Sequence, residues 1–465
     1  MMKTNEASKG FQLPRPLRWL WGDMSLFEIK KFSFLALLFM SIVGGYWMLR
    51  PLKDGIFKLT VGVKYMPYAR MLSLVFIIPL ILLYAKLVDL FRRHWLLYLI
   101  CSAFGATFTT IAVLLQFRPD VPASPANLLG WFTFVVIESY GSITVSLFWS
   151  FVAITTKHQS AARGYSLVVT GGQVGSIIGP TITIFTDYLS LPLLMLMASG
   201  VVFLSVFLTW LYMTLVEIPY QRDRLAAANA HLSSSAPRIV GQLLAGHGDE
   251  AESGDLEANA ARKTINADSE QADDHDEADS KHKTTPGFFV GLKLLLAEPY
   301  LLGIFGITTI YEVIGTVMDF QMKSLADLQL DTQQYTSFLS KFGVAVNTLS
   351  LLLALFGTSS LLRKLGLRAC LLVYPFSVAI SLFLILLYPN IMAIFWAQVM
   401  LKGVSYALNN PAKEILYLPT NPDIKFKVKS WCDMFGGTPR TIICIEWLSL
   451  SLLRVQRVSS RDANT

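Results

Sequence analysis

Ten stretches of about twenty mostly apolar residues alternate with short polar segments along this chain. Each stretch is long enough to cross the hydrocarbon core of a bilayer as a helix. The pattern predicts membrane-spanning helices over residues 32–49, 69–88, 95–117, 128–154, 166–186, 190–216, 299–320, 337–361, 369–388 and 391–408. A membrane β-barrel would instead show shorter segments in which apolar and polar residues alternate. The sequence therefore predicts an all-α polytopic membrane protein.

The segment between the sixth and seventh stretches differs from the rest of the chain. Its run "GDEAESGDLEANAARKTINADSEQADDHDEADSKHK" is acidic and nearly free of large apolar residues, so we expect residues 218–286 to be a disordered cytoplasmic linker. This division is typical of a transporter of the major facilitator type, which is built from two parallel six-helix repeats. The predicted parts are a cytoplasmic N-terminus (1–31), an N-terminal six-helix half (32–217), the linker, an incomplete C-terminal half (287–436) and an atypical tail (437–465).

Composition agrees with a membrane protein. Of the 465 residues, 53% are hydrophobic and only 15% are charged, whereas soluble domains carry about 25% charged residues. The net charge of +7 fits the excess of Lys and Arg that cytoplasmic loops carry. Basic segments such as "KLVDLFRRH", "KHQSAAR" and "RKLGLR" recur in every second loop, which predicts that both ends of the helical core face the cytoplasm.

One predicted outer segment, residues 50–70, breaks this charge pattern. Its single acid is Asp54, and its cations are Arg50, Lys53, Lys58, Lys64 and Arg70. Positive charge on the outer side has no role in setting the orientation of the helices. A basic mouth that attracts an anionic solute explains it, since a cluster of like charge concentrates ligands of opposite sign.

Four ionisable residues stand in or beside the predicted helices. Glu138 and Glu312 lie within the fourth and seventh spans, whereas Lys53 follows the first span and Lys413 follows the tenth. Charges at membrane depth are costly and mark solute or proton pathways. The alternatives are a structural carboxyl for each glutamate and an ordinary interfacial lysine for Lys413.

Taken together, these four residues give each half one lysine and one glutamate, on helices that line the central cavity of a duplicated six-helix transporter. Lysine is a flexible point charge that suits phosphate oxygens. A carboxylate can accept amino or hydroxyl hydrogens or carry a coupled proton. The pattern therefore indicates a shared site for an anion.

The glycines of "GGQVGSIIGP" recur every fourth residue, at Gly171, Gly175 and Gly179, which predicts a close helix-packing seam. No Gly-rich loop ending in Gly-Lys-Ser/Thr occurs in the sequence, so transport driven by nucleotide hydrolysis is not expected. The sequence also has no pattern of a catalytic nucleophile or a metal cluster. We therefore predict neither an enzyme nor a bound cofactor.

Three stretches resemble the ATP/ADP translocases of intracellular bacteria and plastids. They are "LRPLKD", "FWSFVAITTKHQSAARGYSLVVTGGQVGSIIGP" and "PAKEILYLPTNPDIKFKVKSWCD". The resemblance covers most of residues 30–436 outside the linker. It implies a twelve-helix fold that exchanges cytosolic host ATP for bacterial ADP without hydrolysis, whereas some relatives carry other nucleotides or NAD, in some cases coupled to protons.

The resemblance also implies which residues bind substrate. Family members depend on two lysines and two glutamates in the membrane region. Lys53 matches the first lysine, with Arg50 adding charge beside it, and Glu138 and Glu312 match the two glutamates. The second lysine falls within the stretch 413–429, where Lys413 is preferred and Lys427 and Lys429 are the alternatives.

Two features depart from the family pattern. The acidic linker is longer than expected, and the resemblance stops after "CDMFGG". The final segment lacks the expected small-residue helix and a twelfth span, so about ten or eleven transmembrane helices are predicted. A truncated or frameshifted gene product is our hypothesis. Translating the downstream DNA in the other frames tests it, since the hypothesis requires a family-like helix pair there.

The prediction from the sequence is a multi-pass nucleotide transporter of a bacterial inner membrane that exchanges ATP and ADP by alternating access. Its partners are these nucleotides and the lipid bilayer, and no nucleic acid is expected. The alternatives are a proton-coupled or antiport carrier for another nucleotide or NAD, a non-transporting membrane scaffold that binds a partner through its linker, and an inactive remnant.

Overall fold

The computed structural model describes residues 25–222, 226, 296 and 298–416, except 92, 118–122, 157, 357 and 389. Within this part of the chain, ten helices are long and apolar enough to cross a membrane. Every regular element described there is helical. The prediction of an all-α polytopic membrane protein is confirmed.

The helices form two sets. The first set comprises α2 (Leu26–Thr60), η1 (Val63–Tyr65), α3 (Met66–Leu90), α4 (Arg93–Gln116), α5 (Leu128–Thr155), α6 (His158–Thr183), η2 (Ile184–Asp187), α7 (Leu191–Tyr212) and the π-helical η3 (Met213–Glu217). The second set comprises α11 (Pro299–Gln329), α12 (Thr332–Phe356), α13 (Thr358–Leu387), α14 (Ile391–Val404), the π-helical η4 (Ser405–Asn409) and α15 (Asn410–Leu416).

Helix α2 extends beyond the span predicted from hydropathy. It begins at a capping box in which the Glu28 backbone N–H donates to Ser25 Oγ at 3.2 Å and the Ser25 backbone N–H donates to Glu28 Oε2 at 3.0 Å. It continues through Pro51 to Thr60. The prediction that the span ends at residue 49 is wrong, because Arg50 and the charges after it belong to the last turns of the helix.

The glycine seam on α6 brings this helix against α2. A Cβ atom at Gly171 would lie 2.5 Å from the carbonyl oxygen of Ala36, and Cβ atoms at Gly175 and Gly179 would collide with the carbonyl oxygens of Met40 and Gly44. Only glycine allows such an approach of two backbones. The packing role predicted for these glycines is therefore confirmed.

We expect Gly175→Ala to destabilise the protein by about 1–3 kcal/mol, the usual cost of overpacking a well-filled interior. The added methyl group would meet the α2 backbone, which cannot move as a side chain can. Thermal unfolding of the purified protein in detergent measures the effect. Gly200→Ala is the matched control, since Gly200 is exposed and no atom lies within 4 Å of a Cβ built there. Equal unfolding temperatures for the two variants would contradict the seam.

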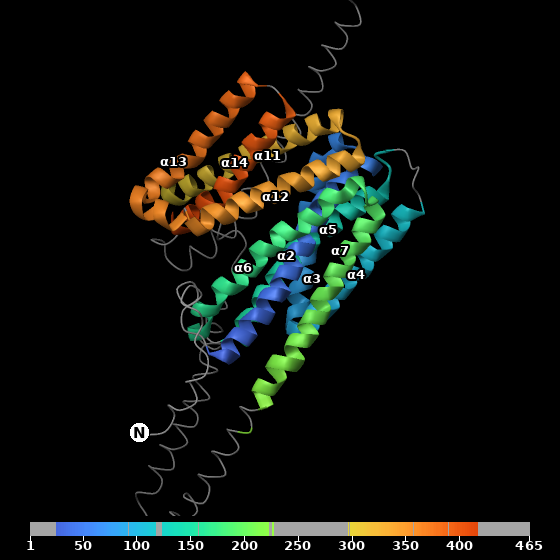
Figure 1. Ribbon diagram of the computed structural model, residues 1–465, viewed down its shortest axis with the longest axis vertical. Helices are drawn as coiled ribbons and strands as arrows, with labels where there is room; N and C mark the ends of the chain where they lie inside the picture. The colour runs from blue at the N-terminus through green and yellow to red at the C-terminus, as the bar shows by residue number, and fades with distance from the viewer. Residues whose placement is uncertain are drawn as a thin grey trace, which may run out of the picture.

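The two helix sets meet along α12, which packs against α2, α6 and η2 and lies beside α6 in Figure 1. Ser337 Oγ donates to the carbonyl of Ile184 at 2.8 Å, and Asn347 Nδ2 donates to the carbonyl of Ser176 at 2.7 Å. Near the end of α2, a Cβ at Gly55 would collide with the side chain of Thr336.

An apolar cluster strengthens this contact. Phe57 and Met66 from the first set join Tyr335, Phe338 and Phe395 from the second. All five side chains are buried. The two sets are therefore closed against each other at the end of the bundle where α2 ends and α12 begins.

Candidate functional site

A cavity of about 450 Å³ lies between the two helix sets. Its walls come from α2, α3, α5, α11, α13, α14, η4 and α15. Its charged lining residues are six cations and three carboxylates: Arg50, Lys53, Arg70, Lys323, Lys402, Lys413, Glu138, Glu312 and Asp319. The excess of positive charge in a partly desolvated space favours an anionic ligand.

The structure brings five of the seven predicted site residues together in this cavity. Arg50 and Lys53 project from α2, Glu138 from α5, Glu312 from α11 and Lys413 from α15. The other two, at positions 427 and 429, lie outside the described residues. Four helices were expected to share a site: the first, fourth, seventh and tenth spans. All four contribute side chains to this one cavity.

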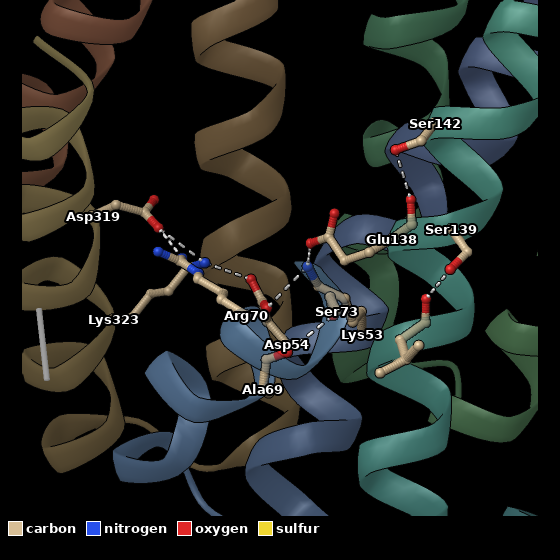
Figure 2. Close-up of polar contacts among 11 residues, drawn as sticks. Lys53, Asp54, Ala69, Arg70, Ser73, Glu138, Ser139, Ser142, Asp319 and Lys323 are labelled. Carbon is tan, nitrogen blue, oxygen red and sulfur yellow. Dashed lines mark hydrogen bonds and ion pairs between the residues drawn. The ribbon is translucent and has the colours of Figure 1, made fainter. Parts of the chain in front are cut away.

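Lys53 is ion-paired with Glu138 across the α2–α5 contact (Figure 2). Its ammonium group also lies 3.8 Å from Asp54 Oδ1 and 4.2 Å from the centre of the Phe134 ring. Lys53 is buried, with 4% of its surface exposed. A buried cation must be balanced by nearby acceptors, and the two carboxylates provide that balance here.

A second charge cluster, centred on Asp319 of α11, was not predicted. Asp319 Oδ2 lies 2.7 Å from Arg70 Nη2 and 3.1 Å from Lys323 Nζ, and its Oδ1 lies 3.3 Å from Lys402 Nζ. Lys323 also contacts Asp54 Oδ2 at 2.7 Å. Figure 2 shows Arg70 of α3 and Lys323 of α11 both pointing toward Asp319, which also belongs to α11. The cluster therefore joins α2 and α3 to α11 and α14, across the two helix sets.

One signal for this cluster was present in the sequence. Lys402 lies inside the predicted span 391–408, and an ionisable residue at that depth is a candidate for function. Asp319 and Lys323 stand four residues apart at the end of the predicted span 299–320, where charges look like those of an ordinary loop. In the structure α11 continues to Gln329, so both residues lie well inside the helix.

Tyrosine side chains form another part of the cavity wall. The rings of Tyr311 and Tyr374 lie 4.5 Å apart between centroids, at an interplanar angle of 47°. Tyr311 Oη donates to the carbonyl of Leu371 at 3.1 Å, and Tyr374 Oη donates to the carbonyl of Tyr311 at 3.3 Å. These bonds fix the rings, whose faces suit contact with a planar group.

The local geometry of α14 places further groups in the cavity. The helix changes to π geometry at Ser405–Asn409 before continuing as α15. Such segments often occur at functional sites because they turn side chains away from their regular helical positions. Ser405 and Tyr406, both in the π segment, line the cavity.

A family model described as the Major Facilitator Superfamily matches residues 32–412. This chain belongs to that superfamily. The match covers all ten candidate membrane spans except the first residues of α2. The protein is therefore a multi-pass membrane protein with a transporter fold, as the helix pattern and the two halves predict.

Curated relatives of this facilitator chain are named ADP,ATP carrier proteins. Their names confirm the resemblance to ATP/ADP translocases seen in the sequence. ADP,ATP carrier protein 1 of Rickettsia bellii (strain RML369-C) is 20% identical over 94% of this chain and 88% of its own length. The carrier of the same name from Chlamydia muridarum (strain MoPn / Nigg) is 23% identical over 93% of this chain and 83% of its own length.

Solved structures agree on the facilitator fold. A mutant of the nucleoside transporter NupG superposes with a TM-score of 0.52 at 10% identity, covering 90% of each chain. The peptide transporter POT in complex with sulfate superposes with a TM-score of 0.54 at 12% identity, covering 90% of this chain and 88% of its own. At these identities the likeness concerns the fold alone.

The prediction of a basic outer loop over residues 50–70 is wrong. Arg50, Lys53 and Arg70 line the cavity of the facilitator rather than a loop. Lys58 contacts Asp327 Oδ1 at 2.9 Å and donates to the carbonyl of Leu330 at 2.7 Å. Arg50, Lys53, Arg70 and Lys58 are tolerated in helical segments because each faces the polar cavity or a partner on the other helix set. Lys64, in contrast, is exposed in η1.

Proposed function

We propose that this facilitator transports nucleotides across a bacterial inner membrane and exchanges ATP for ADP by alternating access, without hydrolysis. The observation that carries the proposal is the cavity between the helix sets, where six cations face three carboxylates. A nucleotide di- or triphosphate is the kind of anion such a lining would hold. The names of the Rickettsia and Chlamydia relatives support the same substrate class.

In this proposal the charged residues have distinct roles. Arg50 and Lys53 of α2 contact phosphate groups, together with Lys413 or one of its alternatives at positions 427 and 429. Glu138 and Glu312 accept hydrogens from the nucleoside part or couple counter-transport. The Lys53–Glu138 ion pair is consistent with a lysine that exchanges one anionic partner for another when substrate enters.

The proposed orientation places both ends of the helical core in the cytoplasm. The end at which α2 stops and α12 begins then faces outward. Since Lys58 and Asp327 close this end at 2.9 Å, the described conformation is closed toward the outside. Transport then requires the two helix sets to separate there and to close at the opposite end, as in other facilitators.

Uptake by intact bacterial cells that normally cannot import nucleotides tests the proposed function. Cells that express this chain should accumulate radiolabelled ATP saturably, and unlabelled ADP should compete. Unlabelled AMP, NAD and other nucleotides, added one at a time, define the substrate range, and cells with an empty vector are the control. Absence of uptake of every nucleotide, with the protein present in the membrane, would contradict the proposal.

Deleting residues 241–283 distinguishes a carrier from a scaffold that binds a cytoplasmic partner. These linker residues lie outside the cavity-forming helices in the sequence, so we expect the deletion variant to retain at least about half of wild-type uptake, well within the usual tolerance of such segments to change. The measurement is the initial uptake rate divided by the amount of protein in the membrane. A scaffold would show no uptake with or without the linker and would lose its cytoplasmic partner on deletion. Loss of wild-type uptake at normal membrane levels would instead contradict the expectation that transport does not need the linker.

A further inference from the structure

We propose that Arg70, Lys323 and Lys402 form the subsite for the terminal phosphates of the substrate, and that Asp319 is an internal counter-anion that competes with those phosphates for the three cations. This inference rests on the proposed transport of nucleotides and specifies how the cavity orients them. It concerns side chains other than the lysines and glutamates predicted from the sequence.

The first argument is the ratio of charges in the cluster. Three cations share the one carboxylate of Asp319, at 2.7, 3.1 and 3.3 Å. Asp54 contacts only Lys323 among them, at 2.7 Å. Lys53, in contrast, has Glu138 as its own partner, and Asp54 lies 3.8 Å from Lys53, farther than from Lys323. Three cations around Asp319 thus share two carboxylates, whereas the single charge of Lys53 is matched by Glu138. An incoming anion therefore finds more uncompensated positive charge around Asp319 than around Lys53.

The second argument is access. Arg70, Asp319, Lys323 and Lys402 all line the cavity, so a ligand there can reach them. The side chains of Arg70 and Lys402 are 24% and 19% exposed, whereas Asp319 is 7% exposed. The two more exposed cations can turn toward a ligand while the carboxylate stays at the wall.

The third argument is the chemistry of the competing anions. A carboxylate offers two oxygens and one negative charge, whereas a terminal phosphate offers three oxygens and close to two charges at neutral pH. The guanidinium fork of Arg70 and two ammonium groups supply more donors than one carboxylate can satisfy. A terminal phosphate is therefore the better acceptor for the three cations together.

The cavity-lining residues along α11 indicate which end of the substrate lies at which end of the cavity. Tyr311, Gly315, Asp319 and Lys323 recur every fourth residue and line the cavity from one side of the helix. At 1.5 Å per residue, Tyr311 and Lys323 lie about 18 Å apart along the axis. An elongated anion with a planar group fits this length, with its phosphates at the Asp319 cluster and its base at the Tyr311–Tyr374 pair.

Calorimetric titration of the purified full-length chain tests the subsite, with ATP and inorganic tripolyphosphate as separate ligands. Lys402→Gln keeps the side-chain length but removes the charge, and we expect it to weaken tripolyphosphate at least about tenfold, the effect of losing one charge-assisted contact. Asp319→Asn removes the competing anion, so it should tighten tripolyphosphate by a similar factor. Lys86→Ala is the matched control, because Lys86 is an exposed lysine outside the cavity.

The direction of the Asp319→Asn effect is decisive, because a purely structural aspartate would weaken binding when it is replaced. Weaker tripolyphosphate binding by this variant, or unchanged binding by Lys402→Gln, overturns the subsite. If Asp319→Asn does not yield folded protein, as judged by its thermal unfolding, the Lys402→Gln titration decides alone.

The two ligands separate this inference from the proposed function. Tripolyphosphate binding that depends on Lys402, together with ATP binding no tighter than that of tripolyphosphate, supports the phosphate subsite and overturns nucleotide recognition. Tight ATP binding that is insensitive to Lys402→Gln supports nucleotide recognition and overturns the phosphate subsite. Absence of binding for both ligands overturns the subsite.

Discussion

Lys53→Ala is expected to lower nucleotide uptake about 10- to 100-fold, since the variant would lose one charge-assisted contact to phosphate, worth about 1.5–3 kcal/mol. The variant leaves the Glu138 carboxylate without its closest cation in the cavity that we propose binds an anion. The measurement is the initial rate of radiolabelled ATP uptake, normalised to the amount of protein in the membrane. Uptake at the wild-type rate would remove Lys53 from phosphate binding.

A double variant distinguishes two roles of Lys53: contact with substrate phosphate and neutralisation of the Glu138 carboxylate. Lys53→Ala combined with Glu138→Ala removes both members of the pair, so no carboxylate is left uncompensated by the loss of Lys53. If Lys53 contacts phosphate, the double variant takes up less ATP than Glu138→Ala alone. Recovery of wild-type uptake would mean that Lys53 only neutralises Glu138.

Oxidation of a Gly55→Cys/Thr336→Cys variant is expected to abolish uptake almost completely, and a reductant should restore it. A Cβ at Gly55 would lie 3.2 Å from the Cβ of Thr336, close to the separation of about 3.5–4.5 Å found in disulfides. The bond would tie α2 to α12 and hold the two helix sets closed at this end. Alternating access cannot proceed through a bundle that is fixed on one side.

The controls for this lock are the two single cysteine variants and a Gly200→Cys/Thr336→Cys variant, in which position 200 contacts no other element closely. Their uptake should not respond to the oxidant. All four native cysteines are present in every variant. Cys101 and Cys370 are buried, and positions 432 and 444 lie outside the described residues. Normal uptake by a protein shown to be cross-linked between positions 55 and 336 would contradict movement at this contact.

Hydrophobic patterning was sufficient to predict the ten spanning helices but not the ends of those that carry charge. Arg50 and Lys53 look like the exit of the first helix from the bilayer, whereas α2 continues to Thr60. In the same way, the charges of Asp319 and Lys323 look like the end of the seventh span, whereas α11 continues to Gln329. A hydropathy profile cannot distinguish a charge that faces water outside the membrane from one that faces a polar cavity within it.

The same limit explains which site residues were found. Glu138 and Glu312 were recognised because apolar residues surround them in the sequence. Arg70 stands at the border of the predicted outer segment 50–70 and the predicted span 69–88, and its contact with Asp319 at 2.7 Å has no signal in the sequence. The pairing of distant residues, such as Lys53 with Glu138, depends on how helices pack, and no spacing along the chain encodes it.

Nucleotide exchange in vesicles tests the central claim most directly. The purified full-length chain is reconstituted into liposomes that contain either ADP or buffer alone, and radiolabelled ATP is added outside. We predict rapid uptake only into the ADP-loaded vesicles, with one ADP released for each ATP that enters as intact ATP, and no change when a proton gradient is dissipated. Equal uptake into vesicles without ADP, or uptake that requires the proton gradient, would contradict exchange.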